Sequence, residues 1–134
     1  MEDYEKELLL RDLGTRLVGG VYCQVDGVDE PVKLLSIHAD HVDGILLQFD
    51  SKDEDGHILE VYVSEVKPYL RSMDNMTEEE EETFKRLKMI AEEDGTFEAS
   101  AMLDDWLDDN HFDRRLLIYQ DLAIEAPEKM YKDN

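Results

Sequence analysis

The chain has 134 residues and a formal net charge of −21, from 35 Asp and Glu against 14 Lys and Arg. Nucleic-acid binding depends on Lys and Arg displacing counterions from phosphates, so this charge argues against nucleic acid as a direct partner. The length fits one compact domain, and 42% hydrophobic residues are enough to form a buried core.

A cytoplasmic protein is expected from three features of the sequence. Cys23 is the only cysteine, so no intrachain disulfide can form. The first residues lack the basic and then apolar segment of a signal peptide. No run approaches the roughly 18 apolar residues of a membrane span, so we expect no membrane partner.

The first half of the chain predicts a short helix and then a small antiparallel sheet. Leu9, Leu10 and Leu13 fall on one side of a helix over residues 4–13, which Gly14 would end. Period-two alternation then predicts four strands, at residues 21–25, 32–39, 45–49 and 58–66. Pro68 is expected to break the strand pattern. Four strands in about fifty residues favour a meander or an SH3-like half-barrel.

The second half predicts helices. Thr77 and Glu80 have the spacing of a capping box, and Asp94-Gly95 marks the end of that helix. A second helix should place apolar side chains inward, with Trp106 anchored in the core; they are Met102, Leu103, Trp106 and Leu107. Four aspartates would face outward; they are Asp104, Asp105, Asp108 and Asp109.

A third short helix is expected over residues 112–120, before a polar tail that follows Pro127. The predicted fold class is therefore α+β, with an N-terminal helix, the β half-barrel and two to three C-terminal helices. We expect a β-rich subdomain over residues 1–73 and a helical subdomain over residues 74–134, packed on it as one unit.

Five phrases spread over most of the chain carry a resemblance. They are Arg11-Asp12-Leu13 with Arg16-Leu17; Val66-Lys67-Pro68-Tyr69-Leu70-Arg71-Ser72-Met73; Met76-Thr77-Glu78-Glu79-Glu80; Asp105-Trp106-Leu107 with His111-Phe112-Asp113; and Leu122-Ala123-Ile124-Glu125-Ala126-Pro127. On these phrases the chain resembles a family of small uncharacterised proteins from gut anaerobic bacteria and their phages or mobile elements. It departs from the family at Val18-Gly19-Gly20, where Pro-Tyr-Gly is usual, and at Leu116, where Gly is usual. The resemblance implies a bacterial or phage intracellular context and brings no assigned activity.

Two segments partly match metal-binding patterns. His38, Asp40 and His41, with Asp43 nearby, resemble a fragment of a metallo-hydrolase motif, but on a strand His41 would point away from the other two. Residues 51–62 place Asp53 and Asp55 in register with a calcium loop, but Ser51 and Tyr62 stand where the terminal carboxylates belong. We therefore expect a polar hairpin end and a solvated loop, and no metal or cofactor.

Catalysis by a nucleophile finds no support in the sequence. Cys23 alternates onto the same face as Val21 and Val25, which predicts a buried and inert thiol. No serine stands in a nucleophile elbow, and no glycine-rich phosphate loop is present. Pairs of carboxylates carry little information about acid-base catalysis, because a chain with 35 acidic residues contains many such pairs by chance. We therefore expect a protein that is not an enzyme and has no catalytic residues.

The leading functional hypothesis is a protein that binds another protein through its acidic surface or through a groove between sheet and helices. The first alternative is an acidic DNA mimic that inhibits a nucleic-acid-binding protein. In it, Asp104, Asp105, Asp108 and Asp109 together with residues 78–82 would present the carboxylates. The second alternative is a small metal-dependent hydrolase around His38, Asp40 and His41.

Overall fold

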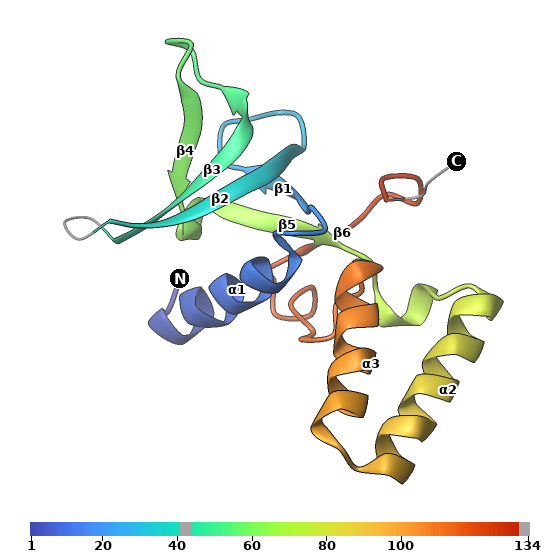
Figure 1. Ribbon diagram of the computed structural model, residues 1–134. Coiled ribbons are helices and arrows are strands. Elements are labelled where there is room, and N and C mark those ends of the chain that lie inside the picture. The colour runs from blue at the N-terminus through green and yellow to red at the C-terminus, as the bar shows by residue number, and fades with distance from the viewer. Residues whose placement is uncertain (41–43, 132–134) are drawn as a thin grey trace.

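The computed structural model describes residues 1–40 and 44–131 and has an α+β fold (Figure 1). Helix α1 (Asp3–Arg16) precedes strands β1 (Tyr22–Val25), β2 (Val32–Asp40), β3 (Gly44–Lys52) and β4 (Ile58–Tyr62). A 3-10 turn, η1 (Val63–Glu65), leads into β5 (Val66–Leu70). The chain continues with a second 3-10 turn, η2 (Met73–Asn75), helices α2 (Glu78–Asp94) and α3 (Phe97–Asp109), and the two-residue strand β6 (Ile124–Glu125).

The strands form one sheet in the order β4-β3-β2-β1-β5-β6. Neighbouring strands from β4 to β5 are antiparallel, and the β5–β6 pair is parallel. Register shifts between Leu34 and Ser36 and between Phe49 and Lys52 mark bulges, which bend strands. Because β5 returns to pair with β1, the first five strands form a small antiparallel sheet, where the alternating pattern predicts a small sheet of four strands.

The core lies between this sheet and α1. Strand β1 buries Cys23 and Val25, while β5 buries alternate residues along its length. Leu9 and Leu13 of α1 are fully buried in the same cluster, which also takes Leu117 and Leu122 from the segment after α3. Burial of each such leucine stabilises the fold by about 2 kcal/mol, so α1 is held to the sheet mainly by its apolar face.

Helix α1 extends beyond the glycine that was expected to end it. The helix continues through Gly14 to Arg16, whose guanidinium donates hydrogen bonds to the Asp12 carboxylate one turn earlier at 2.8 and 3.0 Å. Glycine inside a helix costs only about 1 kcal/mol relative to alanine. The buried Asp12–Arg16 contact, which requires one more helical turn, offsets that cost.

The strand predicted over residues 58–66 is in fact two elements, because η1 separates β4 from β5. The expectation that Pro68 ends strand structure was also wrong, since Pro68 is buried within β5 opposite Cys23. Strand β6 pairs only with Tyr69 and Leu70, so β5 needs no amide at position 68 to bind β6. Proline is tolerated in a strand at such a position.

Helices α2 and α3 form a hairpin that extends away from the sheet (Figure 1). The capping box is confirmed: Thr77 Oγ1 accepts from the Glu80 amide at 3.1 Å, and the Glu80 carboxylate accepts from the Thr77 amide at 2.9 Å. Gly95 ends α2 in the left-handed conformation, with φ at 64°. None of the 17 residues of α2 is buried, so α2 packs on α3 without joining the main core.

The short helix predicted over residues 112–120 is absent from this described segment, which forms turns instead. The Asp113 carboxylate accepts from the backbone amides of Leu117 at 2.7 Å and Ile118 at 2.9 Å. Leu116 has a φ of 57°, which no right-handed helix contains. A side chain that binds nearby amides competes with helix formation, and here the Asp113 contacts replace it.

Candidate functional site

A groove of about 670 Å³ lies between α1 and the open end of the β3–β4 hairpin, where β3 begins and β4 ends. Its apolar wall consists of Leu10 from α1, Ile45 from β3, Tyr62 at the end of β4 and Val63 from η1. Ile45 and Leu10 are half-buried and Tyr62 is 38% exposed, so apolar surface remains open to solvent in the groove. A concave site with apolar walls is a usual place for a ligand or a partner side chain.

Polar groups line the rim of this groove. Asp3, Lys6, Glu7 and Arg11 come from α1, and Ser64 comes from η1. Arg11 donates to Glu7 at 3.1 Å, but both side chains are well exposed, so this ion pair contributes little to stability. The rim can therefore exchange these contacts for contacts with a partner.

An acidic margin lies beside the groove and consists of residues 50–65, from the end of β3 through the turn and β4 to η1. Residues 50–65 contain six acidic residues and one basic residue, a net charge of −5. Strand β4 ends the sheet on this side, and in the part of the chain that the structure describes no strand pairs with its outer edge. The Glu65 carboxylate accepts from the Tyr62 amide at 3.1 Å and so occupies the edge beside the groove.

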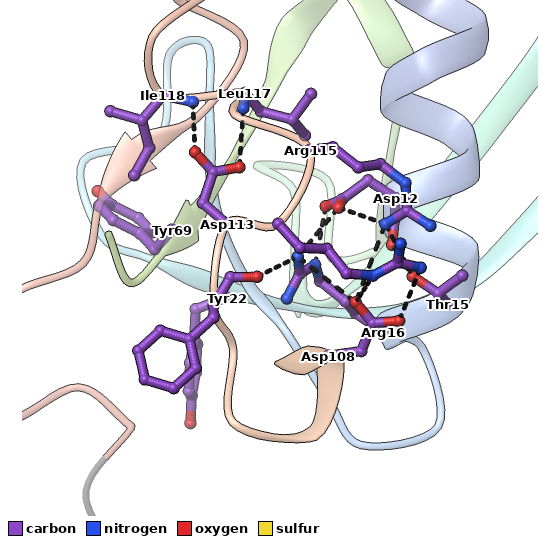
Figure 2. Close-up of polar contacts among 12 residues, drawn as sticks. Asp12, Thr15, Arg16, Tyr22, Tyr69, Asp108, Asp113, Arg115, Leu117 and Ile118 are labelled. Carbon is purple, nitrogen blue, oxygen red and sulfur yellow. Dashed lines mark hydrogen bonds and ion pairs between the residues drawn. The ribbon is translucent and has the colours of Figure 1, made fainter. Parts of the chain in front are cut away.

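A buried ionic cluster joins α1 to the end of α3 and the segment that follows it (Figure 2). Arg16 binds Asp12 and also donates to the Phe112 carbonyl at 2.6 Å. Arg115 donates to Asp12 at 2.8 Å, and Arg114 donates to Asp108 at 2.9 Å. We name these residues the ionic cluster: Asp12, Arg16, Asp108, Arg114 and Arg115. Because each carboxylate contacts at least two guanidinium groups, the cluster is a structural clamp.

The cluster corrects one sequence expectation, that four aspartates of α3 face outward. Asp108 is buried, with the carboxylate bound to Arg114 and 3.7 Å from Arg16. Asp105 and Asp109 are exposed, and Asp104 is half-exposed with one oxygen 3.8 Å from Arg114. The reason is helical spacing, since α3 turns the side chain of Asp108 toward α1 next to the buried Leu107. Asp108 is therefore not part of an acidic surface.

The other residues of α3 follow the predicted pattern only in part. Leu107 is buried as expected, but Trp106 is half-buried and Met102 is 56% exposed. The Trp106 ring lies 5.7 Å from the Phe112 ring, centroid to centroid. Helices α2 and α3 pair with each other apart from the sheet, and Met102 stays on an exposed side of α3.

Of the possible hydrolase motif, His38 is the residue whose side chain the structure describes. His38 is exposed on β2, with its Nε2 at 2.8 Å from the Ser36 hydroxyl and 3.1 Å from the Gln48 amide oxygen. Asp40 ends β2, and His41 and Asp43 lie outside the described residues. His38 thus belongs to a polar cross-strand pair between β2 and β3.

The segment that partly matched a calcium loop is the tight connection between β3 and β4. The Asp53 carboxylate accepts from the amides of Asp55 at 2.9 Å and His57 at 3.0 Å. Possible ligand atoms of Asp53, Asp55 and His57 lie within 4.8 Å of one another, and all three residues are exposed. Ser51 and Tyr62 belong to or adjoin strands, so the carboxylate cage of a calcium loop does not form.

Cys23 is fully buried on β1, as the alternating pattern predicted. Burial, with a smaller contribution from the negative charge of Asp12, raises the pKa of the Cys23 thiol. A thiol with a raised pKa is a poor nucleophile and a poor metal ligand near neutral pH. The described environment of Cys23 is that of a core residue.

The last described residue ties the end of the chain to the sheet. The Tyr131 hydroxyl accepts from the Tyr22 amide at 2.8 Å and donates to the Tyr69 carbonyl at 2.7 Å. Its ring stacks on His111 with the centroids 3.7 Å apart. Two hollows of about 570 and 390 Å³ flank this contact, and both are lined by Arg71 and Tyr131. Burial raises the pKa of Tyr131, so its hydroxyl stays protonated as a donor.

Sequence reasoning anticipated a groove between sheet and helices but named neither its residues nor the ionic cluster. The spacing of Asp12 and Arg16, four residues apart on the same helix as Leu9 and Leu13, was the available signal for the cluster. The adjacent pair Arg114-Arg115 was a second signal, because basic residues are scarce in this acidic chain.

Comparisons of the chain with protein-family models, with curated proteins and with solved structures find no match. Within residues 1–40 and 44–131, no helix combines the length and the apolar character that crossing a membrane requires.

Proposed function

We propose that this chain is a non-enzymatic protein of bacterial or phage origin that acts in the cytoplasm by binding a protein partner. The observation that supports the proposal is the groove between α1 and the β3–β4 hairpin, where Leu10, Ile45 and Tyr62 leave apolar surface open. Open apolar surface of this kind is typical of sites that take a partner side chain, because its removal from water favours binding.

The test is affinity capture from a lysate of the native host with the parent and a groove-filling variant, Ser64→Trp. Ser64 is exposed on the groove rim, so an indole can occupy the groove without entering the core. We expect the parent to retain one saturable partner and Ser64→Trp to lose it, with unchanged melting temperatures. Equal capture by both proteins would contradict the proposal.

The same capture distinguishes the DNA-mimic alternative. A partner that binds this chain in place of DNA should be released when duplex DNA is added, because the two compete for one surface. Retention of the partner in the presence of DNA supports the groove, and release by DNA contradicts it.

A further inference from the structure

We propose that the groove and the outer edge of β4 together bind an extended, basic segment of the partner protein. This inference rests on the proposed function and adds the chemistry of the partner. An apolar side chain of the segment lies in the groove beside Ile45 and Val63, and Lys or Arg residues further along contact the acidic turn that contains Glu54.

The first supporting feature is the open edge of the sheet. The two end strands of the sheet differ, since β6 has two residues and β4 has five. A longer edge strand presents a row of backbone donors and acceptors with which an extended chain can pair. The Glu65 contact closes the edge at Tyr62, which leaves residues 58–61 for pairing.

The second supporting feature is that the groove continues this edge. Tyr62, Val63 and Ser64 line the groove and directly follow the four residues available for pairing. A segment that pairs with residues 58–61 therefore reaches the groove within one or two further residues. Strand β4 lies between the acidic turn and the groove. A partner segment therefore needs roughly five residues of extended chain, at about 3.4 Å each, to reach from one to the other.

The third supporting feature is charge. Residues 50–65 have a net charge of −5 and residues 2–7 on the other side of the groove have a net charge of −3. Complementary charge increases the rate of encounter and selects basic partners over acidic ones. The same charges oppose edge-to-edge pairing of two copies of this chain, because Glu60 and the acidic turns would then face like charges.

The experiment uses a displayed library of random sixteen-residue peptides, selected on the full chain at low salt. We expect enriched peptides to share an apolar residue and, about four to six positions away, at least two Lys or Arg residues. Their affinities are then measured for the parent and for three variants. One variant fills the groove (Ser64→Trp), one reverses two charges at the margin (Glu54→Lys with Glu60→Lys), and one makes the matched change on α2 (Glu92→Lys with Glu93→Lys).

We expect Ser64→Trp and the margin variant each to weaken binding about tenfold or more, and the α2 variant to change it less than about twofold. All four mutated acids are exposed, so folding is not at risk, and thermal melts verify this. Peptides that lack basic residues, or that bind the margin variant as well as the parent, overturn this inference.

Failure of the inference differs from failure of the proposed function. If peptides are sensitive to Ser64→Trp but not to the margin variant, the groove binds protein while the basic-segment inference is wrong. If no peptide responds to Ser64→Trp and lysate capture does not respond either, both are wrong. A concentration-dependent dimer that Ser64→Trp abolishes in sedimentation equilibrium would identify a second copy as the occupant and overturn the inference.

Discussion

Arg71 at the end of β5 and Glu80 in the first turn of α2 form a bidentate ion pair, with nitrogen–oxygen distances of 2.8 and 2.7 Å. The Arg71 guanidinium also lies 4.2 Å from the centre of the Phe112 ring. Glu80 is at the same time the capping-box residue of α2. One pair of side chains thus connects the sheet, the start of α2 and the segment after α3.

Glu80→Gln should lower the free energy of unfolding by about 1 kcal/mol, because glutamine keeps the capping box but loses the charge that binds Arg71. Thermal melts should show a decrease of a few degrees. Glu79→Gln is the matched control, since Glu79 is exposed in the same turn. Equal melting temperatures for both variants would contradict a stabilising role of the pair.

The same pair predicts a pH dependence. The hydrogen bonds from Arg71 are the main cause that lowers the pKa of Glu80 in the folded protein. Its contribution to stability is therefore complete above the unfolded pKa, about 4.3, and is lost as the pH falls below that value through the folded pKa. Urea unfolding at pH 7 and at pH 3 should show that the difference between parent and Glu80→Gln shrinks in acid.

Asp108→Asn should destabilise the fold by about 3 kcal/mol, because it removes the nearest carboxylate of Arg114 and one of the two carboxylates beside the buried Arg16. Asp109→Asn, the matched change at an exposed neighbour, should alter stability by less than about 0.5 kcal/mol. Chemical denaturation measures both differences. A neutral effect at Asp108 would mean that the ionic cluster is not a clamp.

Leu116→Gly should stabilise the protein by up to about 1 kcal/mol. Leu116 has a φ of 57° and is 58% exposed, so glycine removes backbone strain at little loss of burial. Tyr119→Gly is the control, because Tyr119 is 92% exposed and is not among the described residues with positive φ. Thermal melts should move in opposite directions for the two variants.

Cys23 should react with a thiol reagent such as Ellman's reagent at least about a hundredfold more slowly in the native protein than in urea. Burial raises its pKa, so a rise from pH 7 to pH 9 should accelerate the native reaction only through opening of the fold. Rapid native labelling would show that the β1 core opens easily.

The strand and helix periods predicted most of the elements because these depend on local patterns, such as the alternation around Cys23 and the capping box at Thr77. The sequence pattern missed strand β5 because it contains Pro68. Pro68 fits in this strand because β6, on the side away from β1, pairs with Tyr69 and Leu70 and not with Pro68, and β6 lies more than fifty residues later in the chain. The burial of Asp108 depends in the same way on Arg16 and Arg114. The groove could be anticipated as a type of site, but its residues come from three separate segments and required the tertiary structure.

Helix α2 has no buried residue, and its opening would therefore expose little apolar surface. The free energy needed to detach it should be well below that of global unfolding, since the loss consists mainly of the Arg71–Glu80 pair and the contacts with α3. The backbone amides of α2 should then exchange with solvent hydrogen through local detachment, whereas the amides of β1 should exchange only through global unfolding. The sheet and α1, which form the groove, can remain folded while α2 detaches and rebinds.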